Sequence, residues 1–181
     1  MTKQDKDLLL RDLCARLPYG VRGKVEADTV VPHQYDMDGF PIETTFDVDV
    51  ELQQINISND EIFVNANTGN EDLDNYICES QTDGKPWIVD EFTPYLRPIS
   101  SMTEEEIDKL FDILKIDKAS NDNDWIKIND ALGIKFFFPT GKWIEDVALA
   151  YDYLNSIHID YRGLIEKGLA IAVTAENNPY K

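Results

Sequence analysis

Lysine and arginine are absent from the 60 residues between Lys24 and Lys85. Fifteen of the chain's 35 carboxylates lie in this stretch, whereas the other 20 are nearly balanced by all 17 basic residues. Such a segment repels the phosphates of nucleic acids and of anionic membranes, and it attracts cations and basic protein surfaces. We therefore expect a protein partner with a basic surface, and neither direct nucleic-acid binding nor membrane binding.

Long apolar runs, histidines and cysteines are also scarce. No run approaches the ~18 apolar residues of a membrane span, and the three leucines that follow the charged N-terminus are too few for a signal peptide. The two cysteines, Cys14 and Cys78, lack CxxC spacing, which is typical of a reduced compartment. Two histidines argue against a His-rich metal site. We expect a cytoplasmic protein without a metal or cofactor, and the oligomeric state stays open.

Apolar periodicity predicts a single α+β domain over residues 1–181. Apolar residues three and four apart predict helices over 3–17, around 107–114 and over 143–157. Alternation predicts strands over 19–26, 44–57 and 61–66, and the apolar run at 134–138 indicates a buried strand or plug. This order favours a mainly antiparallel sheet with about three helices packed on one face. The strongly acidic strand-and-loop region at 25–84 is either an insertion or part of this sheet.

Short local signals mark where these elements begin, bend or end. The apolar parity of the 44–57 strand changes at residues 53–54, which predicts a β-bulge. Asp38-Gly39 indicates a hairpin turn, and Ser101 to Glu104 fits a helix capping box. The first helix is expected to bury one face, made of Leu10, Leu13, Cys14 and Leu17.

Three blocks of the chain carry a more specific pattern. They are LRDLCARLPYGV at 10–21, PYLRPISSMTEEE at 94–106 and YLNSIHIDYRGLIEKGLA at 153–170. Together these blocks resemble an uncharacterised family of small proteins encoded in prophages and mobile elements of gut anaerobic bacteria. The resemblance implies a mobile-element setting inside a bacterial cell, and it implies no particular chemistry. The acidic region after Val25 departs from the usual, shorter form of these proteins.

A ladder of three carboxylates, Asp47, Asp49 and Glu51, alternates with apolar residues in the 44–57 strand. Side chains two apart in a strand share one face at about 7 Å intervals, so the three are candidate binding residues. A solvated strand face is the simplest interpretation, and a cation site or an imitation of the phosphates of DNA are alternatives. The imitating surface would also include Asp60, Glu61, Glu71, Asp72 and Asp74.

The segment His158, Asp160 and Arg162 places a base, a carboxylate and a cation close together. These residues are candidate catalytic groups of a small hydrolase, but no GxSxG, HExxH or placed Cys nucleophile accompanies them. A structural role is favoured, in which Asp160 and Arg162 close a turn and pair locally. Tyr95 and Arg97 form a second polar pair and are further candidate binding residues, although a role of Arg97 as the anchor of a loop or a helix end is favoured.

Other cofactor patterns are incomplete. Acidic fragments such as Asp122-Asn-Asp124 lack the central Gly and terminal Glu of a calcium loop. The Thr140-Gly141-Lys142 segment lacks the upstream glycines of a phosphate-binding loop. The sequence therefore favours a non-enzymatic protein that binds another macromolecule. Its alternatives are an acidic DNA mimic that acts on a restriction or nucleoid protein, and a hydrolase that uses His158.

Overall fold

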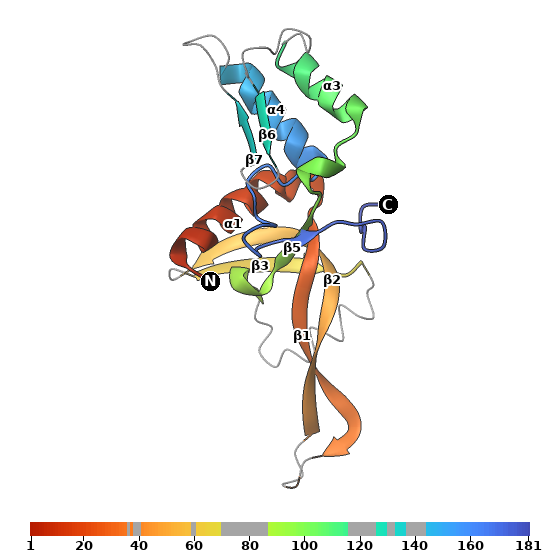
Figure 1. The fold of residues 1–181 in the computed structure, drawn as a ribbon. Helices are drawn as coiled ribbons and strands as arrows, with labels where there is room; N and C mark the ends of the chain where they lie inside the picture. Colours follow the sequence, from red (N-terminus) through yellow and green to blue (C-terminus); the bar gives the residue numbers. More distant parts are fainter. Residues whose placement is uncertain are drawn as a thin grey trace.

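A computed structural model of the chain gives the fold (Figure 1). It describes the backbone of residues 1–35, 37, 41–58, 61–69, 87–115, 126–129, 133–136 and 144–181, and the side chains of 1–27, 37, 45–57, 62–69, 87–115 and 147–181. Within these residues lie three α-helices: α1 (Lys3–Arg16), α3 (Glu104–Ile113) and α4 (Ile144–Ser156).

The main sheet has six described strands in the order β4-β3-β2-β1-β5-β8. They are β1 (Arg22–Tyr35), β2 (Pro41–Ser58), β3 (Glu61–Asn67), β4 (Trp87–Ile88), β5 (Thr93–Leu96) and β8 (Ile171–Ala172). All neighbours pair antiparallel except β5 and β8, which are parallel. A second sheet pairs β6 (Ile126–Asn129) with β7 (Gly133–Phe136). The expected α+β fold with a mainly antiparallel sheet is confirmed, and strands from the acidic region belong to the main sheet.

The β1–β2 hairpin joins two long strands, of 14 and 18 residues. The two strands pair from Arg22 and Glu51 to Tyr35 and Pro41, whereas β5 pairs with β1 only at Gly23 and Lys24. The part of the hairpin beyond these contacts extends away from the rest of the sheet as a two-stranded arm (Figure 1). A two-stranded ribbon is marginally stable alone, so the paired base of the arm holds it in place.

Two apolar clusters form the core. In the first, Leu9 and Leu13 of α1 pack with Val48, Val50 and other sheet residues, so α1 covers one face of the sheet. In the second, α3 packs against α4, next to the chain that follows α4. Figure 1 shows α3 and α4 on the same side of the sheet as α1.

The buried face of α1 differs from the expected one. Cys14 is exposed and Leu10 is half-buried, so the prediction that both are buried is wrong. The residues of α1 that are buried are Leu9, Asp12, Leu13 and Arg16. Apolar periodicity cannot predict a buried helix face that includes two charged residues, because it counts only apolar positions.

Two of the local signals can be compared with the structure. The register of β2 against β3 shifts between Leu52 and Gln54, which confirms the predicted bulge. The capping box lies two residues later than expected: Thr103 accepts from the Glu106 amide, and Glu106 accepts from the Thr103 amide. Ser101 instead belongs to the 3₁₀ helix η3 (Ile99–Ser101). The Asp38-Gly39 turn lies outside the described residues.

Candidate functional site

The candidate binding face is the solvent side of β2 at Asp47, Asp49 and Glu51, called the acidic face below. Between and after these residues, Val48, Val50 and Leu52 are 5%, 2% and 2% exposed, because they point into the first core cluster. The alternation therefore orients the three carboxylates toward solvent, where Asp47 and Asp49 are exposed and Glu51 is half-buried. Since α1 packs on the opposite side, the acidic face is open in the described part of the chain.

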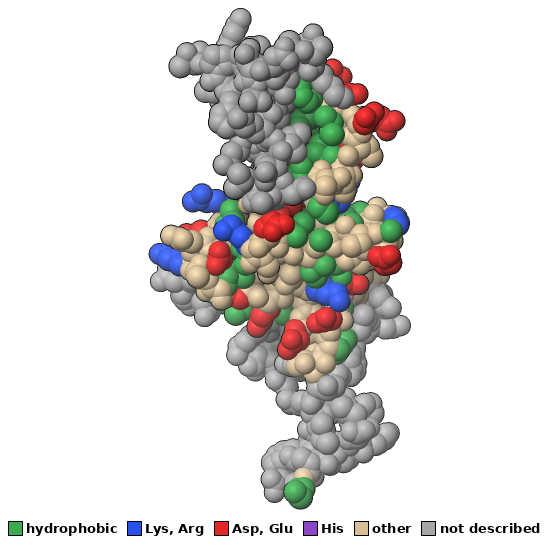
Figure 2. Space-filling model, in the orientation of Figure 1, with side chains coloured by type: hydrophobic (Ala, Val, Ile, Leu, Met, Phe, Trp, Pro, Cys, Tyr) green, Lys and Arg blue, Asp and Glu red, His purple; other side chains and the backbone are tan. Residues whose placement is uncertain are grey.

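Cations from the neighbouring strand lie beside the acidic face. Arg22 stands opposite Glu51 in the register, and its Nη2 is 3.4 Å from the Glu51 carboxylate. Lys24 lies 3.4 Å from Asp47, and both pairs are exposed. Acidic and basic side chains lie together over the base of the hairpin in Figure 2. This end of the acidic face is therefore of mixed charge. Arg22 and Lys24 are the last basic residues before the stretch that has none, and the pairing of β1 with β2 places them beside the carboxylates of β2.

Asp49 has a different partner. The Tyr95 hydroxyl donates to its Oδ1 over 2.7 Å, so β5 contributes a side chain to the same surface. Burial and this hydrogen bond raise the pKa of Tyr95 above its usual value. Tyr95 is thereby joined to the acidic face, whereas Arg97 is not. The other residues of the proposed phosphate-imitating surface lie outside the described side chains: Asp60, Glu61, Glu71, Asp72 and Asp74.

A buried charge network between α1 and the 158–165 segment was not expected from the sequence. Arg16 donates from Nε and Nη2 to both oxygens of Asp12, over 2.7 and 3.0 Å, and both side chains have no exposed surface. Arg16 also donates to the Ile159 carbonyl over 2.8 Å. The i,i+4 spacing in α1 was the available signal, but such pairs are usually on the surface.

Arg162 and Asp160 serve separate partners. Arg162 donates to Asp12 over 2.7 Å, so it joins the network of α1 rather than pairing with Asp160. The Asp160 carboxylate accepts from the amides of Leu164 and Ile165, over 2.9 and 2.8 Å. Asp160 therefore closes the turn that follows it, while the expected local pair with Arg162 is absent.

His158 is held in an unusual conformation. Its φ is 57°, its side chain is 7% exposed, and its ring stacks on Tyr180 with centroids 3.8 Å apart. Burial, together with the positive charges of Arg16 and Arg97, lowers its pKa to about 4. Its Nδ1 has no hydrogen-bond partner among the described residues, and both Asp160 oxygens accept backbone amides. The His–Asp arrangement of a hydrolase is therefore not formed here.

Arg97, which directly follows β5, bonds to the ends of two helices. It donates from both terminal nitrogens to Glu106, over 2.7 and 2.9 Å, and also to the carbonyls of Ser101 and Ile157. The hydrogen bond from Arg97 holds the pKa of Glu106 below its usual value. Arg97 thus ties β5 to the N-terminus of α3 and to the end of α4.

Comparisons with family models, curated proteins and solved structures find no match for this chain. Among the described residues, no group of three or more His, Cys, Asp or Glu side chains could hold a metal ion. The described helices include none that is long and apolar enough to cross a membrane.

Proposed function

We propose that the chain is a non-enzymatic protein of a phage or mobile element that binds a protein partner in the bacterial cytoplasm. The binding element is the acidic face together with the β1–β2 arm, and the partner presents a basic surface. The mobile-element setting rests on the sequence resemblance, and the binding element rests on the geometry of the hairpin.

The observation that carries this proposal is an open row of carboxylates on a hairpin that extends beyond the sheet. The apolar side chains of β2 account for its core contacts, so the acids at Asp47, Asp49 and Glu51 are not needed for packing. Within residues 28–46 the sequence adds four more acids and no base. Exposed charges of one sign steer an oppositely charged partner and accelerate its association.

The mixed charge at the base of the hairpin favours a protein over an imitation of DNA. A phosphate track needs unpaired charges at regular intervals, whereas Arg22 and Lys24 lie 3.4 Å from two of the three ladder carboxylates. Exposed pairs of this kind contribute little stability and exchange partners readily. A partner protein with both charge signs can bind such a face. Its Lys or Arg side chains would meet the carboxylates of the acidic face, and its carboxylates would meet Arg22 and Lys24.

A non-enzymatic role is supported by the contacts of the candidate catalytic residues and of Arg97, because each of these side chains packs against or bonds to other parts of the fold. Asp160 and Arg162 hold the turn after α4, and Arg97 holds two helix ends. His158 is covered by the Tyr180 ring. These contacts support a structural role for the four residues.

Affinity capture from bacterial lysate tests the proposal. Wild-type protein is compared with the variant Asp47→Asn, Asp49→Asn, Glu51→Gln at about 50 mM and 500 mM salt, because interactions between exposed charges more than about 10 Å apart are already largely screened at 0.1 M salt. We expect specific proteins with basic surfaces to be captured at low salt by wild type and lost by the variant.

A matched control is the variant Asp7→Asn, Asp152→Asn, Glu166→Gln, which makes the same charge change at exposed positions away from the hairpin. It should capture the same proteins as wild type. Equal loss in both variants would mean that net charge, rather than the acidic face, determines capture, and the proposal would be wrong.

A further inference from the structure

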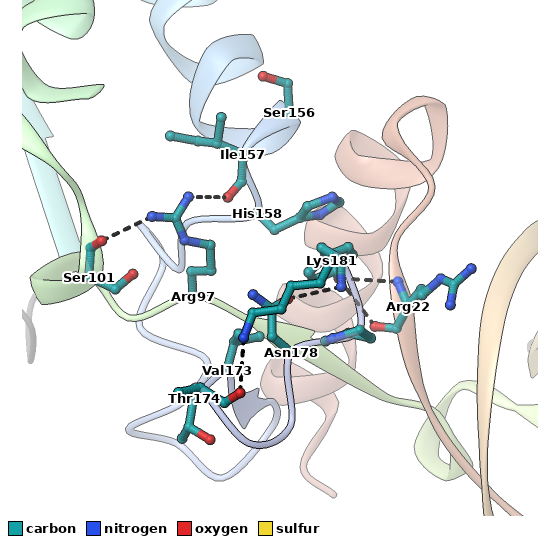
Figure 3. Close-up of a pocket in the computed structure, with 13 residues that line it drawn as sticks. Arg22, Arg97, Ser101, Ser156, Ile157, His158, Val173, Thr174, Asn178 and Lys181 are labelled. Carbon is teal, nitrogen blue, oxygen red and sulfur yellow. Dashed lines mark hydrogen bonds between the residues drawn. The ribbon is translucent and has the colours of Figure 1, made fainter. Parts of the chain in front are cut away.

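Arg22, which pairs with Glu51 of the acidic face, also lines a groove among the described residues. The groove has a volume of about 950 Å³ and is bordered by the start of β1, by η3, by the end of α4 and by residues 173–181 (Figure 3). Tyr180 holds the C-terminal segment in place, because its hydroxyl donates to the Tyr95 carbonyl over 2.8 Å and its ring stacks on His158. The groove is therefore built from four separate parts of the chain.

Its charge is opposite to that of the molecule. Arg22, Arg97 and Lys181 line the groove, and none of the described residues that line it is an aspartate or a glutamate. The chain as a whole has a formal net charge of −18. Since the low pKa of His158 keeps this side chain neutral at pH 7, the positive charge of the groove comes from the other three residues.

The three cations differ in how freely they can bind a ligand. Arg97 is fixed by Glu106, which neutralises most of its charge. Among the described residues, Arg22 makes the exposed, 3.4 Å pair with Glu51, and the Lys181 ammonium donates to the Ala175 carbonyl over 3.0 Å. An ammonium carries three donors, so Lys181 keeps two for a ligand. Arg22 and Lys181 are therefore the groups that an anion would meet.

We propose that this groove binds an oxyanion, the phosphate or carboxylate group of a small molecule, through Arg22 and Lys181. Ligand sites of small molecules have volumes of about 300–1,000 Å³ and a few polar groups that fix the ligand. The groove matches this size, and Ser101, Ser156 and Asn178 add hydrogen-bonding groups to its wall. Charge-assisted hydrogen bonds from Arg and Lys are the usual recognition of both oxyanions. Arg22 is shared with the acidic face through its pair with Glu51, but the oxyanion proposal does not rest on the proposed protein binding.

Titration of the full chain with inorganic pyrophosphate and, separately, with citrate tests the site by ¹⁵N NMR. We expect shifts at residues of the groove with a Kd on the order of 1 mM or tighter. Binding in the Arg22→Gln, Lys181→Gln variant should weaken about tenfold, since it loses charge-assisted hydrogen bonds. The control Arg11→Gln removes an exposed cation of α1 that does not line the groove and should leave binding unchanged.

The two probes separate the sources of the oxyanion. Tighter binding of pyrophosphate identifies a phosphate-bearing ligand, and tighter binding of citrate identifies a carboxylate-bearing one. The absence of shifts in the groove with both probes at about 10 mM, or an equal weakening by Arg11→Gln, would overturn the proposal. The spectrum of each free variant establishes that it is folded.

Discussion

Asp12 and Arg16 form a fully buried ion pair. Both have no exposed surface, and Asp12 also accepts from Arg162, so one carboxylate serves two guanidiniums. Removing ions from water costs several kcal/mol each, and only good geometry and further hydrogen bonds offset that cost. The network therefore acts as a specific connection between α1 and the segment after α4, which apolar contacts alone would leave less defined.

Replacing Asp12 by Ala should lower the free energy of unfolding by about 3–5 kcal/mol, because it leaves the Arg16 charge buried without its partner. Chemical denaturation measures the change, and Asp7→Ala on the exposed side of the same helix should stay within about 0.5 kcal/mol of wild type. The pair variant Asp12→Leu, Arg16→Met should recover much of the loss. A small effect of Asp12→Ala alone would argue against the buried network.

His158 predicts a pH dependence of stability. Its pKa in the folded protein is about 4, below the ordinary histidine value of 6.5, so the unfolded chain binds more protons between these values. Stability from this group is complete above pH 6.5 and falls as the pH drops toward 4, by on the order of 3 kcal/mol. Asn tolerates positive φ, so His158→Asn keeps the backbone conformation.

The measurement is the melting temperature of wild type and His158→Asn from pH 7 to pH 4. The difference between the two proteins should move in favour of the variant as the pH falls. Parallel curves would contradict the buried, neutral state of His158. Lysate capture by His158→Asn at pH 7 should equal that of wild type, and a selective loss of an activity would instead favour an enzyme.

At the scale of elements, the strands were the more predictable part of the chain. Alternation in β2 is strong enough to locate the strand, its buried face and its bulge, because only one parity buries Val48 and Val50. The register in which β1 pairs with β2 was harder to predict from the sequence. A two-residue turn at Asp38-Gly39 would place Arg22 opposite Ile55, whereas the shift of pairing between Val30 and Tyr35 places it opposite Glu51. That shift brings the bases beside the acids.

The buried face of α1 and the site residues beyond the hairpin show where local pattern fails. The stacking of His158 on Tyr180 and the pairing of Arg162 with Asp12 join residues far apart in sequence. Such contacts follow from the tertiary fold, so a periodicity argument has no access to them. The turn closed by Asp160 was predictable, because its partners are four and five residues away.

Gly23 allows β1 to approach β5 closely. A Cβ atom at this position would lie 2.6 Å from the Thr93 carbonyl oxygen and 2.7 Å from the ring of Phe92. We expect Gly23→Ala to lower the free energy of unfolding by about 1–3 kcal/mol, as overpacking of a well-packed site does. Urea denaturation measures this, and wild-type stability in the variant would show that the two strands can separate without cost.

At the scale of the whole molecule, charge is divided between two surfaces. The acidic face is a row of carboxylates on β2, and the groove beside the C-terminal segment is lined by Arg22, Arg97 and Lys181. With this distribution of charge, the acidic face would attract a basic partner, and the groove would attract a small anion.

Duplex DNA and RNA should not bind the purified protein. Nucleic-acid affinity depends on a basic face that releases counterions, and the three cations of the groove are too few beside the net charge of the chain. A gel shift at about 50 mM salt with micromolar affinity, falling steeply as salt is added, would contradict this expectation.

The association rate of a captured partner with the immobilised protein tests the central claim most directly. The acidic face should steer encounter, so wild type should associate about tenfold faster at 50 mM than at 500 mM salt. The variant Asp47→Asn, Asp49→Asn, Glu51→Gln should associate slowly at both, with a nearly unchanged dissociation rate, while Asp7→Asn, Asp152→Asn, Glu166→Gln matches wild type. Equal association rates in all three proteins would contradict a binding role for the acidic face.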